Sequence, residues 1–234
     1  MKLKPRLAGV ASFVPAGSVV ADIGTDHAYL PVHLVTEKGC PRVIAVEKSV
    51  NNTKKARETI SFFNLEHKVE LRTGDGLLAL KAQDGVEVVV LAGIGGLSIC
   101  KILMAAGEEL RRYRRIVLQP MGDLPLVRRW LFAHRFSFFR EKLVLERGHF
   151  YEIIAAEKGT GEIREPLYLE LGPDLLRGED PLVIPWLEGK LKRYEEILRG
   201  LSRVRSGKRE HRWSYFYHRY QTVKGVLENI SHRK

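Results

Sequence analysis

The residues best suited to chemistry stand close together near the start of the chain. An apolar run ends in Asp22, and the polar segment Gly24-Thr25-Asp26-His27-Ala28-Tyr29 follows it. A buried strand that leads through a ligand-binding loop into a helix is how a doubly wound sheet opens its first nucleotide-binding crossover. Such loops usually contain three glycines, whereas here Asp26 and Ala28 occupy two of those places and only Gly24 remains. The segment therefore predicts a small-molecule site of unusual composition.

Each side chain of this loop has a ligand-binding interpretation and a structural one. Asp22 either accepts backbone N–H bonds from the loop or faces an amino group of the ligand. Asp26 replaces a glycine, so we expect its carboxylate to enter the pocket near a cationic amine or sulfonium. His27 either contacts the ligand or caps the next helix, and Tyr29 either stacks on a base or packs against the protein.

Two further acids follow the next apolar runs. Glu47 ends the run Val43–Val46, twenty-five residues beyond Asp22. A carboxylate at that point can accept hydrogen bonds from both hydroxyls of a ribose, so we expect Glu47 to bind an adenosine. In Gly74-Asp75-Gly76 an acid lies between two flexible residues, where it either accepts from an adenine amino group or belongs to a plain turn.

Later segments suggest how a second substrate is held. The glycines of Ala92-Gly93-Ile94-Gly95-Gly96 let the backbone close over a ligand or an incoming base, and the following helix start offers free N–H groups. The Asp or Asn, two prolines and aromatic residue typical of exocyclic-amine methylation are absent here. In Gln119-Pro120 the amide either bonds a base edge or stabilises a loop.

The elements that must position these residues alternate between strands and helices. This alternation predicts an α/β fold with right-handed crossovers and a mostly parallel sheet. The runs 136–146 and 149–156 are separated only by Arg147-Gly148, so they must form a hairpin that ends the sheet antiparallel. We expect strands near 19–23, 42–46, 69–72, 86–92 and 115–119, and helices near 27–37, 50–63, 77–82, 97–109 and 124–134.

The last quarter of the chain has a different pattern. Residues 159 to about 185 read as a connection, and beyond them apolar residues recur every three or four positions in two stretches, 187–201 and 213–230. This pattern predicts an antiparallel helical hairpin joined by the polar run 205–209. The domains expected are therefore 1–158, which carries the site, and 159–234, the connection and hairpin.

Charge favours a polyanionic partner. The 234 residues hold 39 Lys and Arg against 28 acids, a formal net charge of +11. From Leu187 onward there are thirteen basic and five acidic residues, which indicates either a solvated helical surface or substrate contact. Lys2, Lys4 and Arg6 form a basic N-terminal element, and arginines near 111–115 and 128–135 suit phosphate geometry.

Composition does not favour a disulfide-rich, zinc-binding, secreted or membrane-spanning protein. Cys40 and Cys100 lie far apart and offer neither a disulfide framework nor zinc spacing, so we expect no metal. We find no signal-peptide core and no run of about eighteen apolar residues for a membrane span. We therefore expect a cytoplasmic, monomeric protein without a membrane partner.

Together these residues resemble the bacterial TrmK family of tRNA (adenine-22-N1)-methyltransferases. The resemblance rests on the segments 22–31, 74–76, 92–96 and 118–120 in the family's order, and Met121 departs from the polar residue expected after Pro120. It implies a class I S-adenosylmethionine-dependent methyltransferase fold, S-adenosyl-L-methionine as methyl donor and N1 of an adenine in tRNA as acceptor.

The alternative functions are a nicotinamide-dependent oxidoreductase, which would keep the three-glycine loop, and a non-catalytic RNA-binding protein, which would lose the pocket acids.

The site residues follow from the chemistry above, read together with the same resemblance. We assign catalysis to Asp26, Tyr29 and Gln119, cofactor binding to Asp22, Gly24, Asp26, His27, Glu47, Asp75, Gly76, Ala92 and Gly93, and substrate binding to Lys4, Arg6, Gly95 and Pro120.

Overall fold

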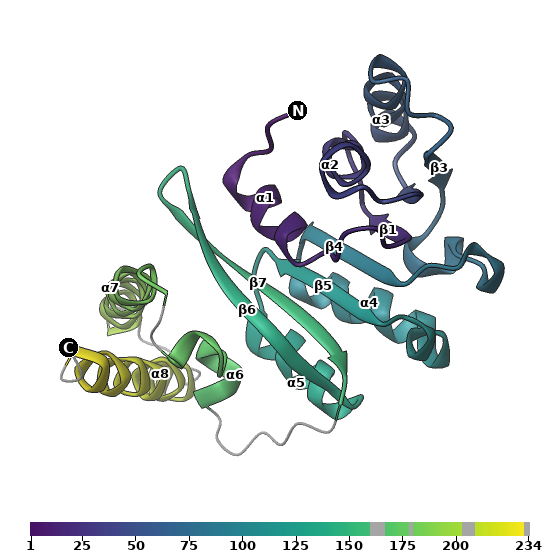
Figure 1. Cartoon of the computed structure of the whole chain (residues 1–234). Coiled ribbons are helices and arrows are strands. Elements are labelled where there is room, and N and C mark those ends of the chain that lie inside the picture. Colours follow the sequence, from purple (N-terminus) through teal and green to yellow (C-terminus); the bar gives the residue numbers. More distant parts are fainter. Residues whose placement is uncertain (160–166, 178–179, 203–208, 232–234) are drawn as a thin grey trace. The chain divides into compact units, whose positions relative to one another are not determined.

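A seven-stranded sheet forms the centre of the first of two compact units. The computed structural model describes residues 1–159, 167–177, 180–202 and 209–231, and the chain divides into units of residues 1–164 and 165–234. The strand order is β3-β2-β1-β4-β5-β7-β6 (Figure 1). The strands are β1 (Val20–Ile23), β2 (Val43–Glu47), β3 (Val69–Thr73), β4 (Val88–Ile94), β5 (Arg115–Pro120), β6 (Phe136–Glu146) and β7 (His149–Lys158).

Pairing within the sheet confirms the predicted topology. The first five strands are parallel, β7 pairs antiparallel with β5, and β6 pairs antiparallel with β7. Because β1 is central and every one of its residues is buried, the loop that follows it lies at the middle of the sheet's carboxyl edge. This is where a doubly wound sheet binds its ligands.

Helices cover both faces of the sheet (Figure 1). One apolar core lies under α1 (Pro5–Ser12), α2 (Tyr29–Lys38) and α3 (Val50–Phe62). The other lies under α4 (Gly96–Ala106), the short helix η3 (Gly107–Arg112) and α5 (Leu124–Ala133). Together they bury the sheet on both sides, which explains why its strands read as continuous apolar runs.

Three predicted helices differ in their bounds for local reasons. The helix expected at 27–37 begins only at Tyr29, because Asp26 and Ala28 both have positive φ. The helix expected at 97–109 ends at Ala106, where Gly107 turns left-handed and a 3-10 turn follows. The helical segment expected at 77–82 is not one continuous helix: it consists of two short 3-10 helices, η1 (Gly76–Ala79) and η2 (Ala82–Asp84).

The antiparallel hairpin of β6 and β7 is tied to α5 by a buried ion cluster. The guanidinium of Arg128 is fully buried and donates from Nε to Glu141 Oε1 at 3.0 Å and from Nη2 to Glu152 Oε2 at 2.8 Å. Glu141 belongs to β6 and Glu152 to β7, so one side chain of α5 joins both strands.

The described residues of the second unit form helices. They are α6 (Leu167–Leu171), η4 (Leu175–Arg177), α7 (Val183–Ser202) and α8 (Arg209–Ser231). The rings of Tyr194 and Phe216 lie 6.2 Å apart, and the Tyr220 hydroxyl donates to Glu195, so α7 and α8 pack side by side. The predicted polar link lies, apart from Arg209, outside the described residues.

Glu170 organises the packing of this unit from α6. It accepts hydrogen bonds from the Tyr194 hydroxyl and from Arg219, and Lys190 Nζ lies 3.8 Å from its carboxylate. Burial alone would raise the pKa of Glu170, but the charges of Lys190 and Arg219 and the bond from Tyr194 outweigh it, so the pKa lies below its usual value.

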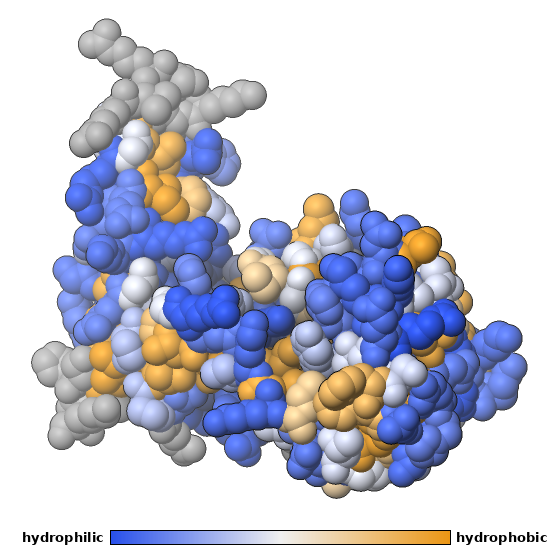
Figure 2. Space-filling view, turned by 90° about the horizontal axis from the view of Figure 1, so that it is seen from above, coloured by the Kyte–Doolittle hydropathy of each residue, from blue (hydrophilic) through white to orange (hydrophobic). Residues whose placement is uncertain are grey.

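The face of the helical unit that Figure 2 shows is mainly hydrophilic. The helix pair at the left of Figure 2 shows blue side chains over most of the visible face, with limited orange areas among them. Among the helices that the structure describes, none combines the length and apolar character that a membrane crossing requires.

Candidate active site

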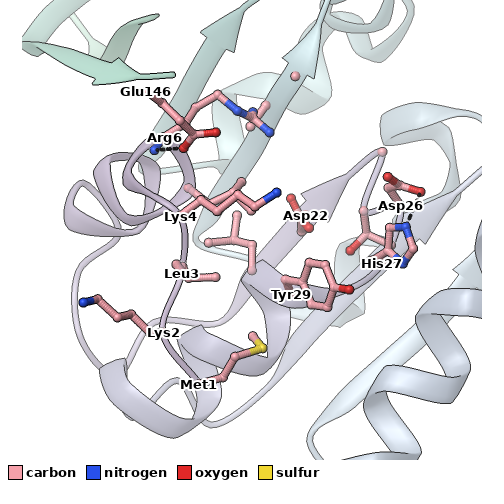
Figure 3. Close-up of a pocket in the computed structure, with 16 residues that line it drawn as sticks. Met1, Lys2, Leu3, Lys4, Arg6, Asp22, Asp26, His27, Tyr29 and Glu146 are labelled. Carbon is pink, nitrogen blue, oxygen red and sulfur yellow. Dashed lines mark hydrogen bonds and ion pairs between the residues drawn. The ribbon is translucent and has the colours of Figure 1, made fainter. Parts of the chain in front are cut away.

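A pocket of about 630 Å³ opens at the carboxyl ends of β1 and β4. Its walls come from the N-terminal segment, the loop between β1 and α2, the end of β4 and the end of β6 (Figure 3). Nine residues that the sequence analysis assigned to the site line this pocket: Lys4, Arg6, Asp22, Gly24, Asp26, His27, Tyr29, Ala92 and Gly93.

The loop after β1 keeps a glycine-like backbone although it has lost two glycines. Gly24, Asp26 and Ala28 have φ of 78°, 48° and 56°, all in the left-handed region. A side chain at Gly24 would also meet Ile94 Cδ1 at 3.2 Å. Asp26 and Ala28 therefore keep the backbone shape that glycines would give, and Asp26 adds a carboxylate to the loop.

Asp22 is the most strongly perturbed acid of the pocket. Its side chain is buried at the end of β1, and burial raises the pKa of its carboxyl to about 6. The Thr25 side chain lowers the pKa, the Glu47 carboxylate raises it, and the Arg6 guanidinium lowers it. A buried carboxylate without an ion-pair partner in the described structure is ready to accept a cationic group.

Glu47 binds the backbone of the loop after β1 and that of the segment after β2. Its Oε2 accepts from the backbone N–H of Asp26 at 3.1 Å and its Oε1 from that of Ser49 at 2.7 Å. Each oxygen has a second lone pair, so these bonds leave room for ribose hydroxyls. Glu47 is buried and does not itself line the pocket.

His27 and Tyr29 form a flat aromatic surface at one end of the pocket. Their rings are stacked with centroids 5.2 Å apart and an interplanar angle of 2°, and Tyr29 is 44% exposed (Figure 3). His27 does not cap α2, whose N-cap is Ala28. Asp26 lies beside the stack, with Oδ1 3.9 Å from His27 Nε2, and its side chain is exposed.

Gln119 lies behind the pocket wall rather than in the pocket. The side chain is fully buried at the end of β5, and its Oε1 accepts from Arg6 Nη1 at 2.6 Å and from the Gly93 N–H at 3.1 Å. In this arrangement the Gln119 Oε1 is therefore already occupied and not free for the predicted contact with a base edge.

Four other assigned residues lie outside the pocket lining. Asp75 forms an exposed ion pair with Lys48 at 2.8 Å. Gly76 has a φ of 58° and packs against Ile102, Gly95 is the exposed N-cap of α4, and Pro120 is buried in β5. The pocket thus brings together most of the predicted loop residues but not these four, whose roles stay predictions.

Two features of the pocket wall were not predicted from the sequence: Glu146 and the helix α1. Glu146 ends β6, lines the pocket and accepts from the backbone N–H of Arg6 at 2.9 Å. No local pattern marks Glu146, since its partner lies 140 residues away. The helix α1 did have a signal, namely Pro5 at its first position followed by apolar residues at helical spacing.

Within the described ranges, no group of three or more His, Cys, Asp and Glu side chains is placed to hold a metal ion. Cys40 and Cys100 are both free and buried.

Comparison with known proteins identifies one family. Residues 3–154 match a family model described as a methyltransferase domain. The tRNA (adenine(22)-N(1))-methyltransferase of Bacillus subtilis is 35% identical over 159 residues, which are 68% of this chain and 66% of that relative.

Two crystal structures extend the similarity to nearly the whole chain. The B. subtilis M1A22 tRNA methyltransferase TrmK matches with a TM-score of 0.86 and 28% identity over 97% of this chain and 99% of its own. A candidate tRNA (m1A22) methyltransferase of Streptococcus pneumoniae, in complex with S-adenosyl-L-methionine, matches with a TM-score of 0.87 and 30% identity over 97% and 100%. The chain belongs to the TrmK family of S-adenosyl-L-methionine-dependent tRNA (adenine-22-N1)-methyltransferases.

Proposed function

We propose that this protein methylates N1 of adenine 22 in tRNA, with S-adenosyl-L-methionine as the methyl donor. The observation that carries the proposal is the pocket at the carboxyl ends of β1 and β4, which joins buried Asp22, exposed Asp26 and the His27–Tyr29 stack. Family membership supports the same reaction.

The pocket residues fit this cofactor. When bound, S-adenosyl-L-methionine supplies a methyl group activated by a sulfonium. Asp22 offers a buried carboxylate to an ammonium group, Gly24 keeps the loop backbone open to a close approach, and Glu47 lies at the end of β2 with lone pairs for ribose hydroxyls. The volume of about 630 Å³ is within the range of small-molecule pockets.

The chemistry asks little of the protein beyond alignment. Adenine N1 carries a lone pair and no proton, so it can attack a methyl group without a general base. Holding the two reactants in line can contribute roughly 7–11 kcal/mol at best. The adenine must first be turned out of the folded RNA at a cost of a few kcal/mol, which stacking on Tyr29 offsets. Asp26 stabilises the positive charge that develops on the base.

The remaining assignments complete the proposal. Lys4 and Gly95 lie at exposed positions where RNA can reach them, whereas Asp75, Gly76 and Pro120 act from outside the pocket lining. We infer that residues 1–158 bind the cofactor and that residues 159–234 form a separate domain. We also infer that the protein works as a monomer in the cytoplasm, where its tRNA is found.

The test is transfer of a labelled methyl group to unmodified bulk tRNA, followed by nucleoside mass spectrometry. The proposal expects 1-methyladenosine, and it expects no product from transcripts in which adenine 22 is replaced. Cofactor binding without transfer to any RNA would point to another acceptor. Full turnover by both Asp26→Ala and Tyr29→Phe would show that these two side chains are not catalytic.

A further inference from the structure

The amide of Gln119 has no hydrogen-bonding capacity left for a substrate. Its Oε1 accepts from Arg6 Nη1 and Gly93 N, while its Nε2 donates to Pro120 O at 3.0 Å and to Met121 Sδ at 3.7 Å. A primary amide has two acceptor lone pairs and two N–H groups, so all four are used. These partners also fix which end of the amide faces Arg6.

The Gln119 amide is one of several contacts that hold Arg6 in place. The backbone N–H of Arg6, in the first turn of α1, donates to Glu146, and the guanidinium lies 5.8 Å from the centre of the Tyr151 ring. Gly93 leaves room for it, because a Cβ at that position would come within 3.3 Å of Arg6 Nη1. Both the backbone of Arg6 and the tip of its side chain are therefore fixed.

The fixed guanidinium still has donors to offer. Apart from the bond to Gln119, the described residues give it no other hydrogen bond, so Nε and Nη2 are available to a ligand in the pocket. Figure 3 shows Lys4 and Arg6 extending from the N-terminal segment toward the part of the pocket that holds Asp22. The pocket thus presents two cations beside a buried carboxylate.

Cations and a carboxylate side by side match a zwitterion. An α-amino acid group has an ammonium, which Asp22 can accept, and a carboxylate, which a guanidinium binds through paired N–H groups. Arg6 also lies close enough to Asp22 to lower the pKa of its carboxyl. The methionine end of the proposed cofactor carries this amino acid group.

We propose that Arg6 binds the carboxylate of the cofactor's methionine end and that Gln119 is the positioning residue that aims Arg6 at it. This inference rests on the proposed function for the identity of the cofactor. It revises the sequence-based assignments of Arg6 to the RNA and of Gln119 to the base.

The first experiment compares two ligands by isothermal titration calorimetry. S-adenosyl-L-homocysteine carries the amino acid group, whereas 5′-deoxy-5′-methylthioadenosine lacks it. Arg6→Gln should weaken binding of S-adenosyl-L-homocysteine at least about tenfold, the effect of one charged hydrogen bond, and change binding of methylthioadenosine less than about twofold. The second ligand also reports whether the variant is folded.

The role of Gln119 is tested by a double-mutant cycle. Gln119→Met has a similar volume and no amide, so it should weaken S-adenosyl-L-homocysteine nearly as much as Arg6→Gln and spare methylthioadenosine. The double variant should be no weaker than Arg6→Gln alone, because Gln119 acts only through Arg6. Additive losses, or equal losses for both ligands, would overturn the positioning role.

A third measurement separates the carboxylate from an RNA phosphate. If Arg6→Gln leaves S-adenosyl-L-homocysteine binding unchanged but makes the salt dependence of tRNA binding shallower by about one phosphate, Arg6 contacts the RNA and the inference is overturned. Tight wild-type binding of S-adenosyl-L-homocysteine with no methylation of tRNA would contradict the proposed function and leave this inference standing.

Discussion

Asp22 shows how a single residue joins binding to stability. Its carboxyl is buried, and its pKa of about 6 means that the folded protein without cofactor disfavours the ionised form of Asp22. That ionised form is the one that would pair with a cationic ligand. A shift from 3.8 to about 6 corresponds to about 3 kcal/mol of cost for the ionised form. A cationic group that pairs with Asp22 would remove part of that cost.

Replacing Asp22 by Asn should stabilise the cofactor-free protein. Between pH 3.8 and about 6 the native state keeps a proton that the unfolded chain releases, so the free energy of unfolding falls as pH rises through this window. At about pH 8, Asp22→Asn should therefore raise the free energy of unfolding by up to about 3 kcal/mol, and the gain should vanish near about pH 4.

Denaturant unfolding at a series of pH values measures this effect. Glu58→Gln is the matched control, because Glu58 is exposed on α3. A gain for Asp22→Asn that is independent of pH, or absent throughout, would show that the buried charge is not its source.

Some of the site could be predicted from single residues, and some could not. Asp22, Gly24, Asp26, His27 and Tyr29 are neighbours in sequence, so a strand followed by a helix brings them together without further information. Gln119 and Glu146 both accept hydrogen bonds from Arg6, which lies more than a hundred residues away from each, and no local pattern records such a pair.

At the scale of elements, the β6–β7 hairpin depends on one side chain of α5. Arg128 lies between Glu141 and Glu152 without exposure to solvent. Removing one partner of a buried ion cluster leaves uncompensated charge, which typically costs about 3–5 kcal/mol. The hairpin carries Glu146 to the pocket, so this cluster indirectly supports the start of α1.

Arg128→Met should therefore lower the free energy of unfolding by about 3–5 kcal/mol. Combining it with Glu141→Gln and Glu152→Gln should recover much of the loss, because the two uncompensated carboxylates are then gone. Thermal and denaturant unfolding measure both. Arg129→Met, at an exposed neighbouring position of α5, should change stability by less than about 0.5 kcal/mol. Equal losses for the two arginines would refute the argument.

The order and type of most elements could be predicted because their apolar runs are long and regular. The parallel strands and the antiparallel hairpin follow from run length and from the space between runs. The break within segment 77–82 could not be predicted, since Leu77 and Leu80 are buried as one helix would bury them. Instead, Asp84 accepts from the backbone N–H of Lys81, the N-cap of η2, so a second short helix begins there.

For the whole molecule, the uneven distribution of charge is the main feature. Thirteen of the 39 basic residues follow Leu187, with only five acids among them. Lys192, Arg193 and Arg212 are exposed on α7 and α8. A polyanion such as tRNA is attracted by such a surface through charge and counterion release.

The variant Lys192→Glu, Arg193→Glu, Arg212→Glu should weaken tRNA binding and make its salt dependence shallower by about one or more phosphate contacts. Binding of S-adenosyl-L-homocysteine should not change. Filter binding over a range of salt concentrations measures the slope. The matched control replaces Lys54, Lys55 and Arg57, three exposed basic residues of α3, by Glu. If both triple variants lose the same affinity, net charge rather than the helix pair attracts the RNA.

The strand order has a consequence for synthesis of the chain on the ribosome. β7 lies between β5 and β6, so β6 has no neighbour in the sheet until the later strand has emerged. The helix α1, which precedes every strand of the sheet in the chain, likewise lacks the hydrogen bond to Glu146 in its first turn until β6 has emerged. Contacts of such long sequence separation make folding slow. The nascent protein therefore closes its sheet only after nearly all of residues 1–158 have left the exit tunnel, and until then the edge of β5 needs protection from aggregation.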